Sequence, residues 1–398
     1  MSAAPHKPAA RQPVWFLALF ALAAAGGAVA YVPLLTVLLP QRIAELQGGE
    51  DIAALAQVSF LGAVMASLAN IGVGMVSDYA RLRRPFIVAG LVTSNALLLA
   101  VGTATSVTQI VVLVMVWQIA LNLMLSPLMA WAGDCFPDEQ KGLLGGALAL
   151  SPALGALAGS LVTWAGLVAP EARLALVGVL VSALVLPAVL LGKGRVQPAL
   201  VAPVPAPATA VPVRERVVLR MWAARLLVQV AEGGMFAFLL YWLRSIAPGY
   251  PENGAANIFS LVLVAAVPLS LLLGRWSDAR GRPVVPLVAA ALLCACGMLV
   301  MATAQTLAWA IAGYVLFGLA AAVFLALHSG QTLRVLPAPQ HRGRDLGVFN
   351  LTNTVPGMVM PGLTVILVPQ FGYSALFALF AGLAVMSAVL LAGSLRRS

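Results

Sequence analysis

Two stretches of this sequence are alike and lie 200 residues apart: Gly74-Met-Val-Ser-Asp-Tyr-Ala-Arg-Leu-Arg-Arg-Pro85 and Gly274-Arg-Trp-Ser-Asp-Ala-Arg-Gly-Arg-Pro283. Each runs from the end of a long apolar block into a basic cluster that ends at proline. A second pair keeps the same spacing, namely Pro137-Asp-Glu-Gln140 and Pro337-Ala-Pro-Gln340. A repeat at a fixed offset indicates that the chain contains two copies of one structural unit.

The apolar blocks between these stretches set the class of protein. Of the 398 residues, 62% are hydrophobic and 9% are charged, whereas a soluble domain carries about 25% charged residues. This composition excludes a soluble enzyme, a disordered chain and a disulfide-rich secreted scaffold. A helix needs about 20 apolar residues to cross a bilayer, and an open strand in lipid would leave its backbone unpaired. The sequence therefore predicts an all-α membrane protein.

Hydropathy predicts twelve transmembrane helices in two pseudo-symmetric bundles of six. The spans are expected near 15–39, 52–76, 86–105, 107–132, 143–167 and 172–191, and near 218–243, 255–276, 284–304, 307–331, 346–368 and 373–395. This gives an N-terminal bundle over residues 1–192, a Pro- and Ala-rich cytoplasmic linker over 193–217 and a C-terminal bundle over 218–398. Parallel repeats of this kind are a transporter architecture, with the substrate path between the halves.

The formal net charge of +10 does not indicate a nucleic-acid partner, because the Lys and Arg residues gather in the short breaks between apolar blocks. Cytoplasmic loops of membrane proteins carry such an excess. Placing both termini in the cytoplasm puts most of the 23 Lys and Arg residues on that side. We therefore expect an integral protein of the cytoplasmic (inner) membrane with both termini cytoplasmic.

The doubled stretch resembles the Gly-x-x-x-Asp-x-x-Gly-Arg signature of the major facilitator superfamily. The second copy fits it with Gly274, Asp278, Gly281 and Arg282, whereas the first has Arg81 where glycine is usual. The resemblance implies the twelve-helix fold and transport of a small solute. A finer likeness to the sucrose and glycoside:cation symporter branch comes from Ser77-Asp78, Arg83-Arg84-Pro-Phe-Ile87, Leu346-Gly-Val-Phe-Asn-Leu351 and Pro356.

The residues of the two signature stretches are candidate gates. Each aspartate is expected at the cytoplasmic end of a span, where a carboxylate can cap the N-terminus of a neighbouring helix and pair with arginine. Contacts made in one conformation and broken in the other bias an equilibrium between outward-open and inward-open states. The alternative is that the arginines only satisfy the positive-inside rule. The candidate gating set is Gly74, Asp78, Arg81, Arg83, Arg84, Gly274, Asp278, Arg280, Gly281 and Arg282.

Two charged residues are expected inside the spans, and both fall in the seventh. Arg225, Gln229 and Glu232 lie at positions i, i+4 and i+7, on one helix face. A charge at mid-bilayer costs about 2.5–3.5 kcal/mol on insertion scales. Glu232 is therefore the candidate group for proton coupling, with Arg225 as its partner. The alternative is a buried Arg225–Glu232 bridge through Gln229 that only fixes packing.

Weaker polar groups are candidates for the substrate path. They are spaced to share helix faces or lie near mid-span, and each pair can equally serve as an interhelical hydrogen bond. His328 could relay protons, although a lone histidine near a helix end is usually interfacial. With Gln229, the candidate substrate-binding residues are Tyr31, Gln118, Asn122, His328, Gln331, Asn350 and Asn353.

Cofactor signals are missing from the sequence. No phosphate-binding Gly-rich loop with GK[ST] is found, and His6, His328 and His341 are too scattered for a metal site. We expect no cofactor, no metal and no enzymatic activity.

These observations predict a monomeric secondary active transporter whose partners are a small-molecule substrate, protons and the lipid bilayer. Uptake of a sugar or glycoside is favoured. The first alternative is proton-driven export of a drug or metabolite, which the partial antiporter-like stretch Ser151-Pro-Ala-Leu-Gly155 supports. The second is a non-transporting assembly factor or sensor on the same fold, which would be expected to lose the gate residues.

Overall fold

The computed structural model describes residues 10–47, 52–164, 166–192, 196–201, 211–336 and 339–395, and it contains helices but no strand over these ranges. Ten helices in the described part of the chain are long and apolar enough to cross a membrane. Two further helices, α10 (Val211–Ile246) and the first arm of α14 (Arg342–Leu395), occupy the positions of the expected seventh and eleventh spans. The prediction of an all-α membrane fold is confirmed.

The chain divides into two compact units. Unit 1 consists of Met1–Pro137, Leu150–Pro205 and Ala338–Asn350, and unit 2 consists of Asp138–Ala149, Ala206–Pro337 and Leu351–Ser398. Two short segments, Asp138–Ala149 and Ala338–Asn350, therefore belong to the unit built mainly from the other half of the sequence. Apart from these segments, the units follow the two halves of the repeat.

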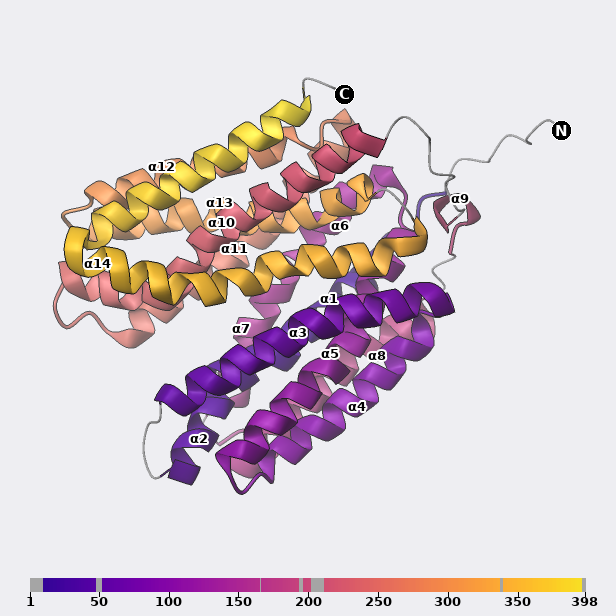
Figure 1. Ribbon diagram of the computed structural model, residues 1–398, viewed down its shortest axis with the longest axis horizontal. Coiled ribbons are helices and arrows are strands. Elements are labelled where there is room, and N and C mark those ends of the chain that lie inside the picture. The colour runs from indigo at the N-terminus through magenta and orange to yellow at the C-terminus, as the bar shows by residue number, and fades with distance from the viewer. Residues whose placement is uncertain are drawn as a thin grey trace. The chain divides into compact units, whose positions relative to one another are not determined.

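In unit 1, α4 and α3 pack on α5, while α1 packs on α7 and α8 (Figure 1). Glycine allows this close packing: a Cβ on Gly90 in α4 would lie 2.3 Å from the backbone nitrogen of Met124 in α5. The elements of unit 1 are α1 (Val14–Pro33), the π-helix η1 (Leu34–Leu38), α2 (Leu39–Gln47), α3 (Ile52–Ala80), α4 (Arg84–Gly102), α5 (Val107–Cys135), α7 (Leu150–Val162), η3 (Pro170–Ala172), α8 (Arg173–Leu191), α9 (Pro198–Val201) and η4 (Pro339–His341), with the first residues of α14.

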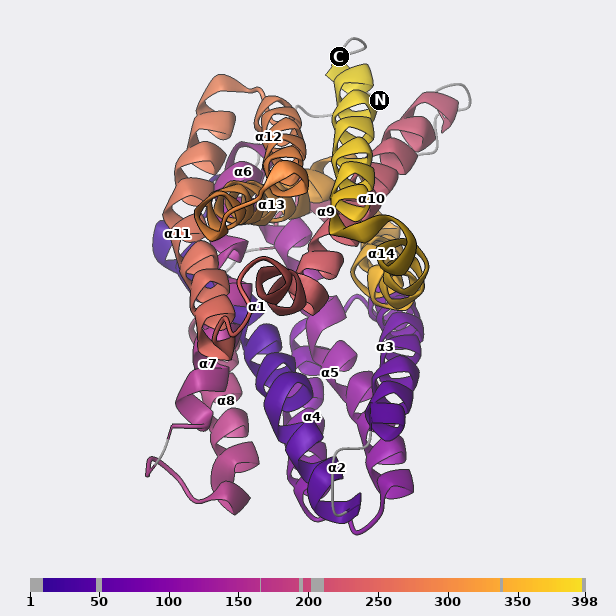
Figure 2. The same ribbon diagram turned by 90° about the vertical axis from the view of Figure 1, so that its left-hand side faces the viewer.

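In unit 2, α13 packs on α11 and α12 (Figure 2). The short helix α6 also packs on α11 and α13. A Cβ on Gly297 in α12 would lie 2.6 Å from the backbone nitrogen of Phe317 in α13, which mirrors the close approach in unit 1. The elements of unit 2 are η2 (Asp138–Gln140), α6 (Lys141–Leu148), α10, α11 (Glu252–Arg280), α12 (Val285–Thr303), α13 (Leu307–Val335) and most of α14.

The helix α14 is two expected spans joined without a loop. Gly372 has a φ of 73° and breaks the helical backbone there, and Figure 1 shows the chain doubling back at this point. Glycine adopts positive φ without the steric cost that other residues have.

Other boundaries also differ from the hydropathy reading. The expected fifth span, 143–167, is two helices, α6 and α7, which belong to different units. The seventh helix begins at Val211, inside the predicted linker 193–217, because Pro212 is tolerated in the first turn of a helix. The assignment of 1–192 and 218–398 as homologous six-helix bundles stays a prediction.

Candidate gates and candidate solute site

The second signature stretch places Asp278 against the start of a helix in unit 2. Its carboxylate accepts hydrogen bonds from the backbone nitrogens of Gly142 (2.9 Å) and Leu143 (2.8 Å), in the first turn of α6. It also pairs with the guanidinium of Arg334. Helix N-termini carry unpaired N–H groups and a partial positive charge, so a buried carboxylate there is stabilised twice.

The first signature stretch makes the corresponding contact in unit 1. The carboxylate of Asp78 accepts hydrogen bonds from the backbone nitrogens of Gly343 and Arg344, both at 3.0 Å, in the first turn of α14. Arg83 Nη2 lies 2.9 Å from Asp78 Oδ1 and completes the site.

The signature glycines make these contacts possible. A Cβ on Gly74 would lie 2.4 Å from the backbone of Gly343, and one on Gly274 would lie 2.2 Å from the carbonyl oxygen of Gly142. Each glycine precedes its aspartate by four residues and so shares its helix face. The glycine brings two backbones together, and the aspartate then reaches the helix end.

The arginine that completes each site comes from a different place in the two units. Asp278 pairs with Arg334, at the end of α13. The residue at the position equivalent to Arg334 in the first copy, 200 residues earlier, is Asp134. The Asp134 carboxylate pairs with Arg83 Nε (2.9 Å) and with Arg342 Nη1 (2.6 Å). Arg83 therefore bridges two carboxylates, which explains why the basic pair of the first copy is displaced toward Pro85.

Sequence reasoning missed Asp134, Arg334 and Arg342. The signal was present, because Asp134 and Arg334 are charged, end their spans and keep the 200-residue offset. The 200-residue offset does not predict the contact of Arg342 with Asp134. That contact forms because the segment Ala338–Asn350 belongs to unit 1.

The other basic residues of the candidate gating set are more exposed. Arg84 lies over the ring of Trp131, at 5.1 Å from its centroid, and donates to the carbonyl of Gly192. Arg280 lies 5.9 Å from the centroid of Trp276. Arg282 is exposed. In contrast to Arg83, these side chains touch neither signature aspartate.

Two glutamines anchor the chain next to the unit 1 site. Gln12 Nε2 and Gln197 Nε2 donate to the carbonyl oxygen of Cys135, at 2.9 and 3.0 Å, and the backbone nitrogen of Gln197 donates to Asp134 O. The last carbonyls of a helix lack intrahelical partners. The start of the chain and the described part of the linker therefore cap α5.

In unit 2, Arg225 lies among neutral acceptors. Nε donates to Thr352 Oγ1 (3.1 Å), and Nη1 donates to the carbonyl of Leu325 (3.0 Å) and to Ser329 Oγ (3.2 Å). Nη2 contacts Asn353 Oδ1 at 3.4 Å. No carboxylate within the described ranges forms an ion pair with it.

Gln229 and Glu232 follow Arg225 on the same face of α10. Gln229 Nε2 donates to Asn353 Oδ1, and its buried Oε1 has no partner in the described part of the chain. Glu232 is half-buried and forms neither a hydrogen bond nor an ion pair with the described residues. It lies near enough to Arg225 and to Tyr314 to act on both electrostatically. A direct Arg225–Glu232 bridge is not formed.

In unit 1, Gln118 and Asn122 lie in the middle of α5. Asn122 Oδ1 accepts from Asn70 Nδ2 at 2.6 Å, and Asn122 Nδ2 donates to the carbonyl of Gln118. Ser126 Oγ donates to the carbonyl of Asn70. This is an interhelical hydrogen-bonded cluster between α3 and α5, in which the polar groups of Asn122 are already used.

The remaining candidate residues lie in three different settings. His328 is fully buried, with Nε2 at 2.9 Å from Met221 O and Nδ1 at 3.2 Å from Thr332 Oγ1. Gln331 Oε1 accepts from Arg334 and so belongs to the Asp278 site. Asn350 is half-buried in unit 1, and Tyr31 is 41% exposed on α1.

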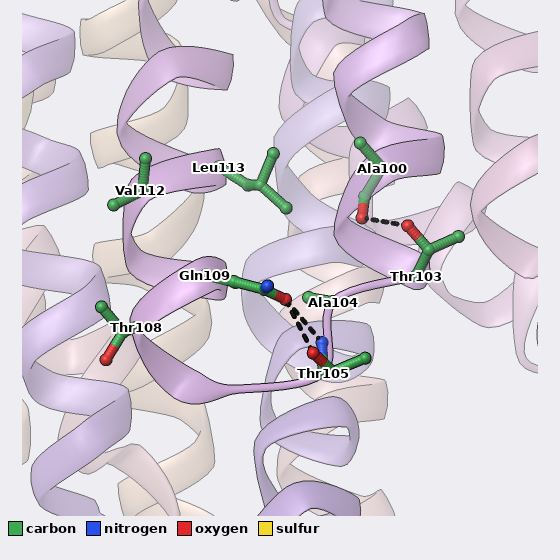
Figure 3. Close-up of a pocket in the computed structure, with 8 residues that line it drawn as sticks. All are labelled: Ala100, Thr103, Ala104, Thr105, Thr108, Gln109, Val112 and Leu113. Atoms are coloured by element: carbon green, nitrogen blue, oxygen red, sulfur yellow. Dashed lines mark hydrogen bonds between the residues drawn. The ribbon is translucent and has the colours of Figure 1, made fainter.

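Two hollows lie in unit 1. One, of about 430 Å³, includes Asp78, Arg83 and Asp134 in its lining. The other, of about 580 Å³, lies at the α4–α5 turn, where Thr105 donates twice to Gln109 Oε1 (Figure 3). Ser106 caps the same turn by accepting from the nitrogen of Gln109, so these polar groups serve the helix end.

The architecture is shared with solved transporter structures. The human organic anion transporter MFSD10 (TETRAN) is 17% identical, with a TM-score of 0.72 over 96% of this chain and 100% of that one. This similarity covers nearly the whole of both chains. The chain has the major facilitator fold. Residues 249–398 also match the family model of the Major Facilitator Superfamily.

Other major facilitator neighbours differ in what they carry. A bacterial homologue of the iron transporter ferroportin is 13% identical, with a TM-score of 0.72 over 97% of this chain and 100% of that one. The fucose:proton symporter FucP of E. coli is 16% identical, with a TM-score of 0.70 over 96% and 97% of the two chains. No curated protein matches the sequence. These similarities establish the fold and leave the substrate open.

Proposed function

We propose that this chain is a secondary active transporter of the cytoplasmic membrane that moves a small organic solute by alternating access, with proton coupling at Glu232. The single observation that carries the proposal is the seating of both signature aspartates on helix N-termini, with a glycine one turn earlier in each case. A scaffold that did not cycle would have no need to keep two such buried contacts. The non-transporting alternative is therefore disfavoured.

Glu232 supports the coupling part of the proposal. A carboxylate in an apolar helix is costly, and this one has no hydrogen bond or ion pair within the described residues to offset the cost. Such a group gains from binding a proton and can release it on the side to which it opens. For the solute, the sequence favours a sugar or glycoside, and one neighbour in fold is a fucose:proton symporter.

Reconstituted vesicles test the coupling. With a solute that the wild-type chain accumulates under a pH gradient, Glu232→Gln should keep solute exchange across the membrane but lose uphill accumulation. Glu171→Gln, which alters an exposed carboxylate, serves as the control and should behave as wild type. Undiminished uphill transport by the Glu232 variant would remove this residue from the coupling role.

Cysteine labelling tests the gates. In a chain without its three native cysteines, a cysteine at Leu143 should be labelled faster when Asp278→Asn loosens the start of α6. Asp138→Asn is the matched control, because Asp138 is a 63% exposed carboxylate that pairs with Lys141 near the same helix start. Equal labelling in all three backgrounds would contradict the gate.

A further inference from the structure

Arg225 forms no ion pair with a carboxylate of the described residues. Its three nitrogens contact a threonine hydroxyl, a serine hydroxyl, a backbone carbonyl and an amide oxygen, all of them neutral. Neutral acceptors satisfy hydrogen-bonding geometry, but they leave the positive charge in place. In an apolar helix bundle such a charge attracts any anion that can reach it.

Three carboxylates of unit 2 are engaged elsewhere or lie farther along the helix. Asp278 is held by Arg334 and two backbone N–H groups, and Asp138 by Lys141. Glu232 lies seven residues beyond Arg225, about 10 Å along the helix axis at 1.5 Å per residue. No described carboxylate therefore neutralises Arg225 by direct contact.

The cluster is accessible on one side and closed on the other. Thr352 is buried and fixes Nε, while Asn353, at Nη2, is exposed. The outer edge of the guanidinium is thus the edge that a small molecule can approach. Beside it, the Oε1 atom of Gln229 is buried and unpartnered within the described residues, and it can accept a hydrogen bond from the same molecule.

We propose that Arg225, with Asn353 and Gln229 beside it, binds the anionic group of the transported solute, and that this solute is a monovalent organic carboxylate. A planar guanidinium matches a carboxylate in a paired, charge-assisted geometry. The Gln229 oxygen would accept from a hydroxyl or amino group next to that carboxylate. The inference rests on the proposed transport function and narrows its solute to carboxylates, sugar acids among them, in place of a neutral sugar or glycoside.

The net charge moved in one transport cycle distinguishes a carboxylate from a neutral solute. One carboxylate anion bound at Arg225 and one proton bound at Glu232 carry no net charge across the membrane. Uptake should then follow a pH gradient and be indifferent to the membrane potential. A neutral sugar carried with one proton would instead move one positive charge and respond to both.

Binding is tested first, with matched probes. Purified full-length protein is heated with D-gluconate or D-glucose, and with benzoate or benzyl alcohol, because a ligand that binds the folded state raises its apparent stability. The carboxylate member of at least one pair should raise the melting temperature, and its neutral partner should not. Stabilisation by neutral members only, or by no member, overturns the proposal.

Variants then locate the site. Arg225→Gln should abolish the carboxylate-dependent stabilisation, and Arg225→Lys should weaken binding by roughly tenfold or more, because it keeps the charge but loses the planar fork. Arg220→Gln removes a cation from the same helix, where Arg220 Nη1 donates to Gly393 O, and should leave the ligand effect intact. If Arg225→Gln does not fold, the Lys variant alone decides, since a purely structural arginine would not change the preference for anion over neutral probe.

Flux measurements separate this inference from the proposed function. Vesicles that take up the stabilising carboxylate under a pH gradient, equally with and without a membrane potential, support both proposals. Uphill uptake of the neutral partner under a pH gradient, with no uptake of the carboxylate, overturns the carboxylate assignment and leaves proton-coupled transport standing. Uptake that ignores the pH gradient overturns the coupling itself.

Discussion

Arg81 and Gly281 occupy equivalent positions of the repeat and share one backbone conformation. Arg81 has a φ of 52° and Gly281 a φ of 61°, and Arg81 is the only residue other than glycine with positive φ in the described part of the chain. Both residues end the helix that carries a signature aspartate. The turn is therefore a property of the repeat, and the first copy forms it with a residue that is strained there.

Replacement of Arg81 by glycine should stabilise the protein. A left-handed conformation costs an L-residue roughly 1–2 kcal/mol, and the greater freedom of glycine in the unfolded chain returns about 0.4–1 kcal/mol of this. We expect a net gain of about 1 kcal/mol, measured as a higher melting temperature in detergent. Ala66→Gly, inside the helix, should instead be destabilising by about 1 kcal/mol, and a fall in stability with Arg81→Gly would count against strain at that turn.

Gly74→Ala should destabilise the seating of α14 on α3. The new Cβ would lie 2.4 Å from the backbone of Gly343, and overpacking of this kind costs about 1–3 kcal/mol. Gly72→Ala is the matched control, because a Cβ there meets nothing within 4 Å and should stabilise the helix slightly. Thermal unfolding of the two variants checks the prediction, and equal melting temperatures would contradict it.

Asp278→Asn should be more harmful than Asp78→Asn. Loss of the Asp278 charge leaves Arg334 with neutral acceptors only, whereas Arg83 keeps Asp134 when Asp78 is changed. Breaking a buried pair costs up to about 3–5 kcal/mol, so we expect a difference of about 1–2 kcal/mol between the two variants. Melting temperatures in detergent measure it, and the reverse order would refute this account of the asymmetry.

Asp134 and Arg342 should be strongly coupled. Their 2.6 Å contact is nearly closed to solvent, with each side chain 7% exposed. A double-mutant cycle with Asp134→Asn and Arg342→Gln should give an interaction energy of about 1–3 kcal/mol. A cycle between Asp134 and the distant Arg173 should give a value near zero. Additivity in the first cycle would show that the contact contributes nothing of its own.

Gln197→Ala should release the linker from α5. The change leaves the carbonyl of Cys135 with Gln12 alone and removes the side-chain contact to Ala10 O. A lost hydrogen bond of this kind is worth about 0.5–1.5 kcal/mol, and faster proteolysis after residue 196 should report it. Gln57→Ala, at an exposed position on α3, should leave the digestion rate unchanged.

The fold could be predicted because its determinants are local. Apolar blocks of bilayer length allow only helices, and the doubled Gly-x-x-x-Asp stretch marks the ends of two equivalent spans. The break at Ala149 was not predictable from hydropathy, since Leu148, Ala149 and Leu150 are all apolar. Membership of α6 in unit 2 is a tertiary property that a sequence window does not contain.

For the candidate site, the sequence predicts the rare polar residues themselves but not the groups with which they form hydrogen bonds. Arg225, Gln229 and Glu232 were found because charge and amide groups are rare in an apolar block and their spacing fixes one face. Thr352, Ser329 and the Leu325 carbonyl were not, because ordinary hydroxyls and backbone carbonyls carry no signal until another helix approaches. His328 was found as a rare polar residue, but its setting was not predictable. Its ring nitrogens are buried and contact Met221 O and Thr332 Oγ1.

The contact of Gly74 with Gly343 is made by bare backbone, with no side chain that could change rotamer to follow a small displacement. A shift of even one ångström would lengthen both N–H contacts to the Asp78 carboxylate at once. Partly released forms would have weakened hydrogen bonds and poorer backbone packing, so the Gly74–Gly343 contact is expected to behave in an all-or-none manner. A helix end held in this way occupies one of two positions. The proposed alternating access needs such behaviour, because a carrier must never be open to both faces of the membrane at once.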